Sequence, residues 1–330
     1  MRSDNLLRRE RLLHPLTAVS LALVILAAFV PIFGDRLMMN IAIMAMIYII
    51  LGHSWNLLTG LAGMFSITHA LFFGLGVYGM SISVAKFHLP IIAGLLVGLL
   101  INIVMSAIVG MIGSKLSGLY FVMAQVGLSQ TIYTLSIQLF PLTGGVTGLS
   151  MPREYLMDKS TLYWIALILA ILTTLAFAFI RRSRMGTMFV ALKENPDLSL
   201  SLGSNVGKWR IMATVMSASM ASLAGSFYAL FMMSNNPEVF SMVISLKIII
   251  VVIVGGIGSV WGPIVGSSLV VMDELIRGIM PTTMAPFSVI IYALVLIIMA
   301  IRHPEGLISI GRSIGLKLEG KSMKKVSISK

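Results

Sequence analysis

The 330-residue sequence contains no cysteine and few charged residues. Without cysteine, the chain can form neither a disulfide bond nor a thiolate metal site. Charged residues make up only 11% of the chain and hydrophobic residues 58%, against about 25% and roughly 45–50% in soluble domains. A soluble fold does not need so much apolar surface. The composition therefore indicates that a membrane surrounds most of the chain.

The sequence also lacks the side-chain arrangements that catalysis requires. Its five histidines are scattered, and no paired carboxylates lie inside an apolar stretch as a general acid and base would. The 25 methionines are typical of flexible packing rather than of a metal relay. We therefore predict that the chain is not an enzyme and binds no metal or cofactor itself.

Two glycine-rich segments resemble nucleotide-binding loops but lack their context. Residues 74–79 match G-x-G-x-x-G, which binds a dinucleotide only between a strand and a helix, whereas here they lie inside an apolar stretch. Together with Gly94 and Gly98 they predict close helix packing. Residues 203–209 end in Trp209 where a phosphate loop needs Ser or Thr, so we predict that this chain does not bind ATP there.

Apolar stretches of about 20 residues, each able to cross a bilayer core of roughly 30 Å, recur along the whole chain. They predict an all-α, polytopic integral membrane protein with about ten transmembrane helices, or eight to ten in all. We expect the first to be an uncleaved anchor. The expected spans are residues 16–33, 37–58, 65–85, 90–113, 119–140, 161–180, 211–233, 244–258, 262–278 and 287–301.

Glycine-rich turns at 59–64 and 255–262 interrupt this pattern. Each fits a tight hairpin, a broken helix, a re-entrant segment or a simple turn. Irregular backbone at membrane depth is tolerated only where protein or a water-filled cavity satisfies its hydrogen bonds. The two turns are therefore candidates for lining a route across the membrane.

The formal net charge of +12 comes from basic residues that concentrate at one membrane face. By the positive-inside rule, this places both termini in the cytoplasm and requires no nucleic acid, only the inner-leaflet lipids. We divide the chain into a cytoplasmic N-terminal segment (1–15), a transmembrane domain (16–301) and a basic cytoplasmic tail (302–330). A basic inner loop spans 181–210, and a long outer loop spans 141–160.

The inner loop contains the signals of a short helix. Asn195 suits the N-cap, Pro196 the first position, and Asp197 the positive end of the helix dipole. Gly203 suits a left-handed terminator. The pattern predicts a helix of about two turns on the cytoplasmic side.

The predicted inner-loop helix would have one apolar edge, formed by Leu198 and Leu202. A helix this short is marginal in isolation, so we expect it to dock. The surface could be another protein or the ends of the chain's own helices.

Several motifs occur in a characteristic order over about residues 50–310. They are Leu58–Gly74 (LTGLAGMFSITHALFFG), Gly118–Phe121 with Gln125, Thr143–Gly145 with Gly148 and Leu149, Ser183–Gly186, Ala191–Pro196, Ala224–Ala229, Gly255–Pro263 and His303–Leu307. This ordered set resembles the permease subunits of branched-chain amino acid ABC transporters, the M-type more than the H-type. Thr68 stands where that family usually has glycine, and Leu198 and Ser199 replace two alanines of the importer loop motif.

The resemblance implies a heteromeric importer in a bacterial or archaeal cytoplasmic membrane. Its other parts would be an H-type permease, two ATPase subunits that hold ATP and magnesium, and a periplasmic or lipid-anchored binding protein. The implied ATPase coupling residues are Glu194, Asn195, Pro196, Asp197, Leu198, Leu202 and Gly203. The expected pathway residues are Ser66, His69, Tyr120, Gln125, Thr143, Gly144, Gly145, Gly255, Gly256 and Gly258.

Two other functions are compatible with a many-span chain: an ion-coupled secondary amino-acid transporter and a channel-like membrane subunit. Ion-coupled carriers usually hold the ion with buried ionisable groups, and the central part of every expected span lacks them. Lys247, Asp273 and Glu274 lie near the ends of their spans. This favours an external energy source, while the sequence leaves open which branched-chain or related neutral amino acid is carried.

Overall fold

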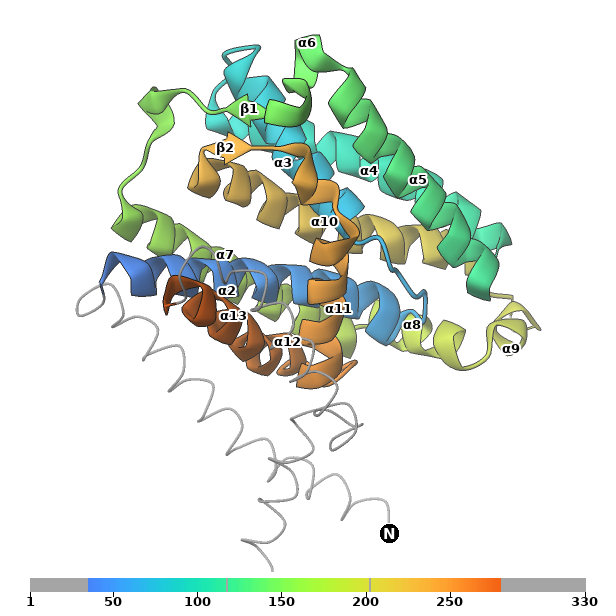
Figure 1. The fold of residues 1–330 in the computed structure, drawn as a ribbon. Helices are drawn as coiled ribbons and strands as arrows, with labels where there is room; N and C mark the ends of the chain where they lie inside the picture. The colour runs from blue at the N-terminus through green and yellow to red at the C-terminus, as the bar shows by residue number, and fades with distance from the viewer. Residues whose placement is uncertain (1–34, 117, 202, 280–330) are drawn as a thin grey trace, which may run out of the picture.

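The structure is a computed structural model, shown in Figure 1. It describes residues 35–116, 118–201 and 203–279. The predicted spans 16–33 and 287–301, the segment 1–15 and the tail 302–330 lie outside the described residues.

Most of the described residues are helical. The longer helices are α2 (Arg36–Trp55), α3 (Ala70–Ala85), α4 (Ile91–Lys115), α5 (Gly118–Gln138), α7 (Lys159–Arg182), α8 (Arg184–Glu194), α10 (Val206–Met232), α11 (Met242–Gly255) and α13 (Ser268–Ile279). The short elements are the π-helix η1 (Asn56–Leu61), α6 (Phe140–Thr143), η2 (Gly145–Thr147), η3 (Arg153–Tyr155), α9 (Pro196–Ser201), η4 (Pro237–Phe240), α12 (Gly262–Gly266) and strands β1 (Leu149–Ser150) and β2 (Ser234–Asn235).

Side-chain caps begin three of these helices. Asp158 accepts a hydrogen bond from Ser160 N at the start of α7, and Ser183 does so from Gly186 N at the start of α8. Asn205 accepts from Lys208 N, 3.0 Å away, and begins α10. These short polar residues satisfy first-turn N–H groups that have no partner within the helix, so each fixes where the polar loop ends.

Helix α10 lies at the centre of the bundle and packs against α3, α4 and α2 (Figure 1). On its other side, α2 packs against α7, α11, α12 and α13. The apolar core between these helices includes fully buried aromatic side chains. The largest are Trp55, Tyr163, Phe72, Phe73 and Phe177.

Glycines bring α3 close to its two neighbours. A Cβ atom on Gly76 would lie 2.8 Å from the Cα atom of Ser222 in α10, and one on Gly225 would contact the backbone oxygen of Phe73. A Cβ atom on Gly79 would lie 2.5 Å from the Cα atom of Gly98 in α4. The packing interpretation of the G-x-G-x-x-G segment is therefore confirmed.

Four described helical segments are long and apolar enough to cross a membrane, judged by length and composition. They are Arg36–Leu61, Ile91–Lys115, Lys159–Arg182 and Val206–Met232, and Ala70–Ala85 and Met242–Gly255 are shorter apolar helices. Helix α5 has sufficient length, but its glutamines and hydroxyl residues keep it out of this set. The all-α polytopic class is confirmed, and the count of about ten spans stays a prediction.

Two predicted spans differ from the observed helices. The span predicted at 65–85 becomes helical only at Ala70, because the preceding segment 62–69 is irregular. The span predicted at 262–278 is divided into α12 and α13 at Ser267. At the other end of the bundle, β1 pairs antiparallel with β2 and ties the 141–160 loop to the end of α10.

Candidate functional site

The first helix break follows α2. At Asn56 the helix widens into the π-helix η1, and residues 62–69 then run back irregularly to the start of α3 (Figure 1). Trp55 Nε1 donates to the carbonyl oxygen of Ser66 (2.7 Å), and Gln125 Nε2 donates to that of Phe65 (3.1 Å). Side chains from α2 and α5 thus satisfy backbone groups that a membrane could not.

The second break lies between α11 and α12. Gly256 and Gly258 adopt positive φ angles of 120° and 73°, which few residues other than glycine adopt. The Asn56 side chain binds this break twice. Its Oδ1 accepts from Gly258 N (2.7 Å), and its Nδ2 donates to the carbonyl oxygen of Ser259 (2.8 Å). The Asn56 amide therefore joins the break after α2 to the break after α11. At both glycine-rich turns, the structure has an interrupted helix.

The inner loop contacts the first break through Lys193, in the last turn of α8. Lys193 Nζ donates to the carbonyl oxygen of Gly60 in η1, 2.9 Å away. The stem of the same side chain lies against Gly63, where a Cβ atom would come within 2.8 Å of Lys193 Cγ. A displacement of α8 would therefore act directly on the backbone of the first break.

The predicted helix of the inner loop is present as α9, which ends at Ser201. Gly203 has a φ angle of 80°, so the prediction of a left-handed terminator is confirmed. Glu194 is exposed at the end of α8. The side chains of Asp197 and Leu198, and all of Leu202, lie outside the described residues. The ATPase contact of this segment stays a prediction.

The structure brings some of the predicted pathway residues together. Ser66 and His69 are fully buried in the first break, where His69 Nε2 lies 2.7 Å from Ser54 Oγ. Gln125 reaches the same break from α5. Gly255, Gly256 and Gly258 form the neighbouring break.

Other predicted pathway residues lie apart from the two breaks. Tyr120 is 77% exposed near the start of α5. Thr143, Gly144 and Gly145 lie at the opposite end of α5, where Thr143 Oγ1 donates to the carbonyl oxygen of Leu139 and shapes the outer loop. These residues flank the breaks from two ends of one helix.

Sequence reasoning missed several residues that fasten the breaks. Asn56 stands four residues before Gly60, and an amide inside an apolar span is itself a signal of an internal partner. The sequence pattern gives Lys193 only as one member of the motif Ala191–Pro196. Ser245 is buried in α11, and its Oγ accepts from Ala70 N at the start of α3. No local pattern identifies that partner.

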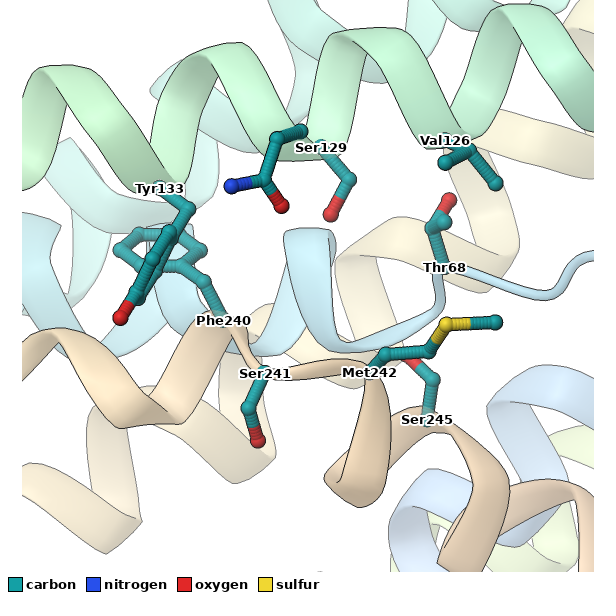
Figure 2. A pocket seen from close by; sticks show the side chains of 9 residues that line it. Thr68, Val126, Ser129, Tyr133, Phe240, Ser241, Met242 and Ser245 are labelled. Carbon is teal, nitrogen blue, oxygen red and sulfur yellow. The ribbon is translucent and has the colours of Figure 1, made fainter.

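A pocket opens beside the first break, between α5 and the starts of α3 and α11 (Figure 2). Its volume is about 220 Å³. No charged side chain is among the described residues that line it. They are Thr68, Val126, Ser129, Gln130, Tyr133, Phe240, Ser241, Met242 and Ser245. The mixture of hydroxyl groups and apolar surface suits a small neutral molecule with polar and aliphatic parts.

The face of α5 next to this pocket is polar. Gln130, Thr131, Thr134 and Gln138 are exposed at helical spacing. In a membrane, exposed amides are stable against protein or water and costly against lipid. This face of α5 therefore borders either another subunit or an aqueous route.

An ion pair joins α11 to α13. Lys247 Nζ lies 2.7 Å from Asp273 Oδ2, and the two side chains are 17% and 2% exposed. The sequence placed both residues near span ends without pairing them. Because α11 and α13 both pack against α2, the ion pair lies between them and fixes the two helices relative to each other.

Interrupted apolar helices, a polar helix face and a basic inner loop in contact with a break define a polytopic membrane permease. Residues 37–300 match the family described as "Branched-chain amino acid transport system / permease component". The chain belongs to this family.

Known relatives agree with the family assignment. The high-affinity branched-chain amino acid transport system permease protein LivM of Salmonella typhimurium is 26% identical over 88% of this chain and 75% of its own length. LivM of Escherichia coli K12 is 26% identical over 88% of this chain and 74% of its own length. LivH of Salmonella typhimurium is 29% identical over 44% of this chain and 46% of its own length. No solved structure matches significantly.

The identification as an M-type permease is confirmed by coverage, because the LivM relatives align over nearly the whole chain and LivH over less than half. The relatives are transport components and not enzymes, as predicted. The chain is a permease subunit and a multi-pass membrane protein.

Proposed function

We propose that the chain forms half of the translocation pathway of an ATP-driven importer for branched-chain amino acids. An H-type permease forms the other half, two ATPases bind the cytoplasmic side, and a binding protein delivers substrate from outside. ATP and magnesium are held by the ATPases. The observation that carries the proposal is the hydrogen bond from Lys193 Nζ to Gly60 O, which links the inner loop to a break in the membrane.

Coupling in this scheme begins at α8 and α9. ATP binding closes the ATPases, which push on Glu194 to Gly203 from the cytoplasm. The displacement reaches η1 through Lys193 and reaches the second break through Asn56. Both breaks are irregular backbone, which bends at lower cost than a continuous helix.

The pathway in this scheme runs along α5. Its polar face meets the H-type subunit, and the pocket beside the first break takes the substrate between the two halves. Ser66, His69 and Gln125 support the wall, while Tyr120 and Thr143 to Gly145 stand at its two ends. In the same scheme both termini lie in the cytoplasm, where the basic segments contact anionic lipids.

Lys193→Met tests the coupling, because methionine keeps the apolar stem and removes the donor. In proteoliposomes containing both permeases, the ATPases and leucine-loaded binding protein, leucine uptake should fall at least about tenfold while ATP hydrolysis persists. Lys208 is exposed in the same inner loop, so Lys208→Met is the matched control and should transport normally.

Two results would contradict the proposal. If Lys193→Met takes up leucine at the wild-type rate, the contact between Lys193 and Gly60 does not couple the ATPases to transport. Uptake by the purified chain alone, driven by an ion gradient and independent of ATP, would instead establish a secondary carrier.

A further inference from the structure

The start of α11 has unused hydrogen-bond donors. Ser241 occupies the N-cap without a side-chain cap, and the first turn contains no acidic residue. Among the described residues, the N–H groups of Met242, Val243 and Ile244 have no acceptor. Such a helix start has partial positive charge and favours an anion.

The start of α3 lies beside the start of α11. Ala70 N, the first amide of α3, donates to Ser245 Oγ one turn into α11, 2.9 Å away. Helix α3 begins after the irregular segment 62–69, and α11 begins directly after η4 and Ser241. The first amides of α3 already have acceptors, because Leu71 N and Phe72 N donate to the carbonyl oxygens of Thr68 and His69. The free donors beside the start of α3 therefore belong to α11, whose positive end suits the anionic group of a transported molecule.

A hydroxyl group of α5 faces these helix ends. Ser129 is only 8% exposed, and its Oγ has no hydrogen-bond partner among the described residues. Figure 2 shows it projecting from α5 into the pocket, toward the starts of α3 and α11. This hydroxyl is therefore free to donate to a ligand oxygen in the pocket.

The pocket supplies no negative charge to compete with a ligand. Glu238, the acidic residue nearest in sequence to α11, is exposed and does not line the pocket. Val126, Tyr133 and Phe240 provide apolar lining next to the hydroxyl groups. The volume of about 220 Å³ accommodates a small amino acid.

We propose that this pocket is a transit subsite for the α-carboxylate of a neutral aliphatic amino acid. The first-turn N–H groups of α11 and the Ser129 hydroxyl donate to the carboxylate, and the aliphatic side chain lies against the apolar lining. A helix end attracts the carboxylate without a fixed counter-ion, so binding is weak enough for release. The inference rests on the proposed function for its substrate, but its electrostatic part is tested separately.

The electrostatic test uses the absence of native cysteine. Ser129→Cys provides the chain with a single thiol in the pocket, and Thr131→Cys provides one on the exposed face of the same helix. The full-length chain is treated with thiol-reactive reagents of similar size, one with a sulfonate and one with a trimethylammonium group. For each variant, the rate of labelling by the sulfonate reagent is divided by the rate for the ammonium reagent. This ratio should be at least about threefold higher for Ser129→Cys than for Thr131→Cys.

An equal or lower ratio at position 129 would overturn the proposal. So would failure of both reagents to label it, because a pocket closed to them is closed to an amino acid. Ser241→Cys, at the pocket's other wall, replaces Ser129→Cys if that variant does not fold, with the same expectation.

The transport test compares Ser129→Asp with Ser129→Asn in the reconstituted importer. The two side chains have the same shape, so a steric effect lowers uptake equally, whereas a carboxylate would occupy the helix end and repel the substrate. Leucine uptake should be at least about tenfold lower for Asp than for Asn. Equal uptake by the two variants would refute the subsite. If the wild-type importer transports no amino acid, the proposed function fails, and the labelling ratio still decides the electrostatics.

Discussion

At the scale of single residues, a few polar side chains hold together what the apolar surface cannot. Asn56 is fully buried, and its amide uses both its donor and its acceptor on the backbone of the second break. Because the helix periodicity is broken there, these backbone groups have no partner along their own chain. A buried amide with matched partners is therefore the structural link between η1 and the end of α11.

Replacing Asn56 with leucine removes this link while keeping a similar volume. Gly258 N and Ser259 O would lose their partner, at about 1–3 kcal/mol for each buried group left unsatisfied. We expect a clearly lower midpoint of thermal unfolding for the purified protein. Thr134→Ala, whose hydroxyl bonds only to its own helix, is the control and should leave the midpoint unchanged. An unaltered midpoint in Asn56→Leu would show that the breaks are held by other contacts.

At the scale of elements, close approach of backbones replaces the hydrophobic effect between helices. Helix α3 is short, yet it packs closely between α4 and α10, because glycines on all three helices remove the side chains that would separate them. Helix α11 is held differently, by the Lys247–Asp273 ion pair to α13 and by Ser245 to α3. The two shorter apolar helices, α3 and α11, are thus fixed by different contacts.

The glycine contact between α3 and α10 predicts opposite outcomes for two similar substitutions. A Cβ atom at Gly225 would lie 2.9 Å from Val77 N, whereas nothing lies within 4 Å of a Cβ atom at Gly127 in α5. Gly225→Val should therefore abolish monodisperse folded protein in gel filtration, and Gly127→Val should elute as wild type. Normal folding of Gly225→Val would contradict the packing.

The ion pair between α11 and α13 predicts a rescue. Asp273→Asn breaks the ion pair with Lys247 and should lower the free energy of unfolding by about 3–5 kcal/mol. Changing both residues together, to Lys247→Met and Asp273→Leu, should restore most of the loss because no buried charge remains. Denaturant unfolding of the single and double variants measures the difference. If the double variant is as unstable as the single one, the loss of stability does not come from the charge that remains on Lys247.

At the scale of the whole molecule, the proposed function requires the two ends of the bundle to face opposite sides of the membrane. The outer loop around Val146 and the inner loop around Leu200 are both exposed, and the cysteine-free chain allows either to be labelled alone. In intact cells, an impermeant maleimide should label Val146→Cys and should label Leu200→Cys only after permeabilisation. The reverse pattern would place the termini outside and remove the basis for ATPase contact at α9.

The sequence by itself determined the class of protein and much of its local structure. Membrane insertion depends on hydrophobicity summed over about 20 residues, and helix starts at Asp158, Ser183 and Asn205 depend on residues two or three positions away. Both quantities are local, although the predicted spans begin at 161 and 211, after the observed starts of α7 and α10. The left-handed Gly203 follows in the same way, whereas the sequence left open which kind of turn or break the two glycine-rich segments form.

Only the tertiary structure decided which separate segments meet. Asn56 binds a backbone group 202 residues away, and Lys193 binds one 133 residues away. The pocket is assembled from the end of one break, one face of α5 and the start of α11. No period or spacing specifies such contacts, because they depend on how irregular backbone is satisfied after the helices have packed. The candidate subsite therefore depends on the starts of α3 and α11 lying beside Ser129, which only the tertiary structure specifies.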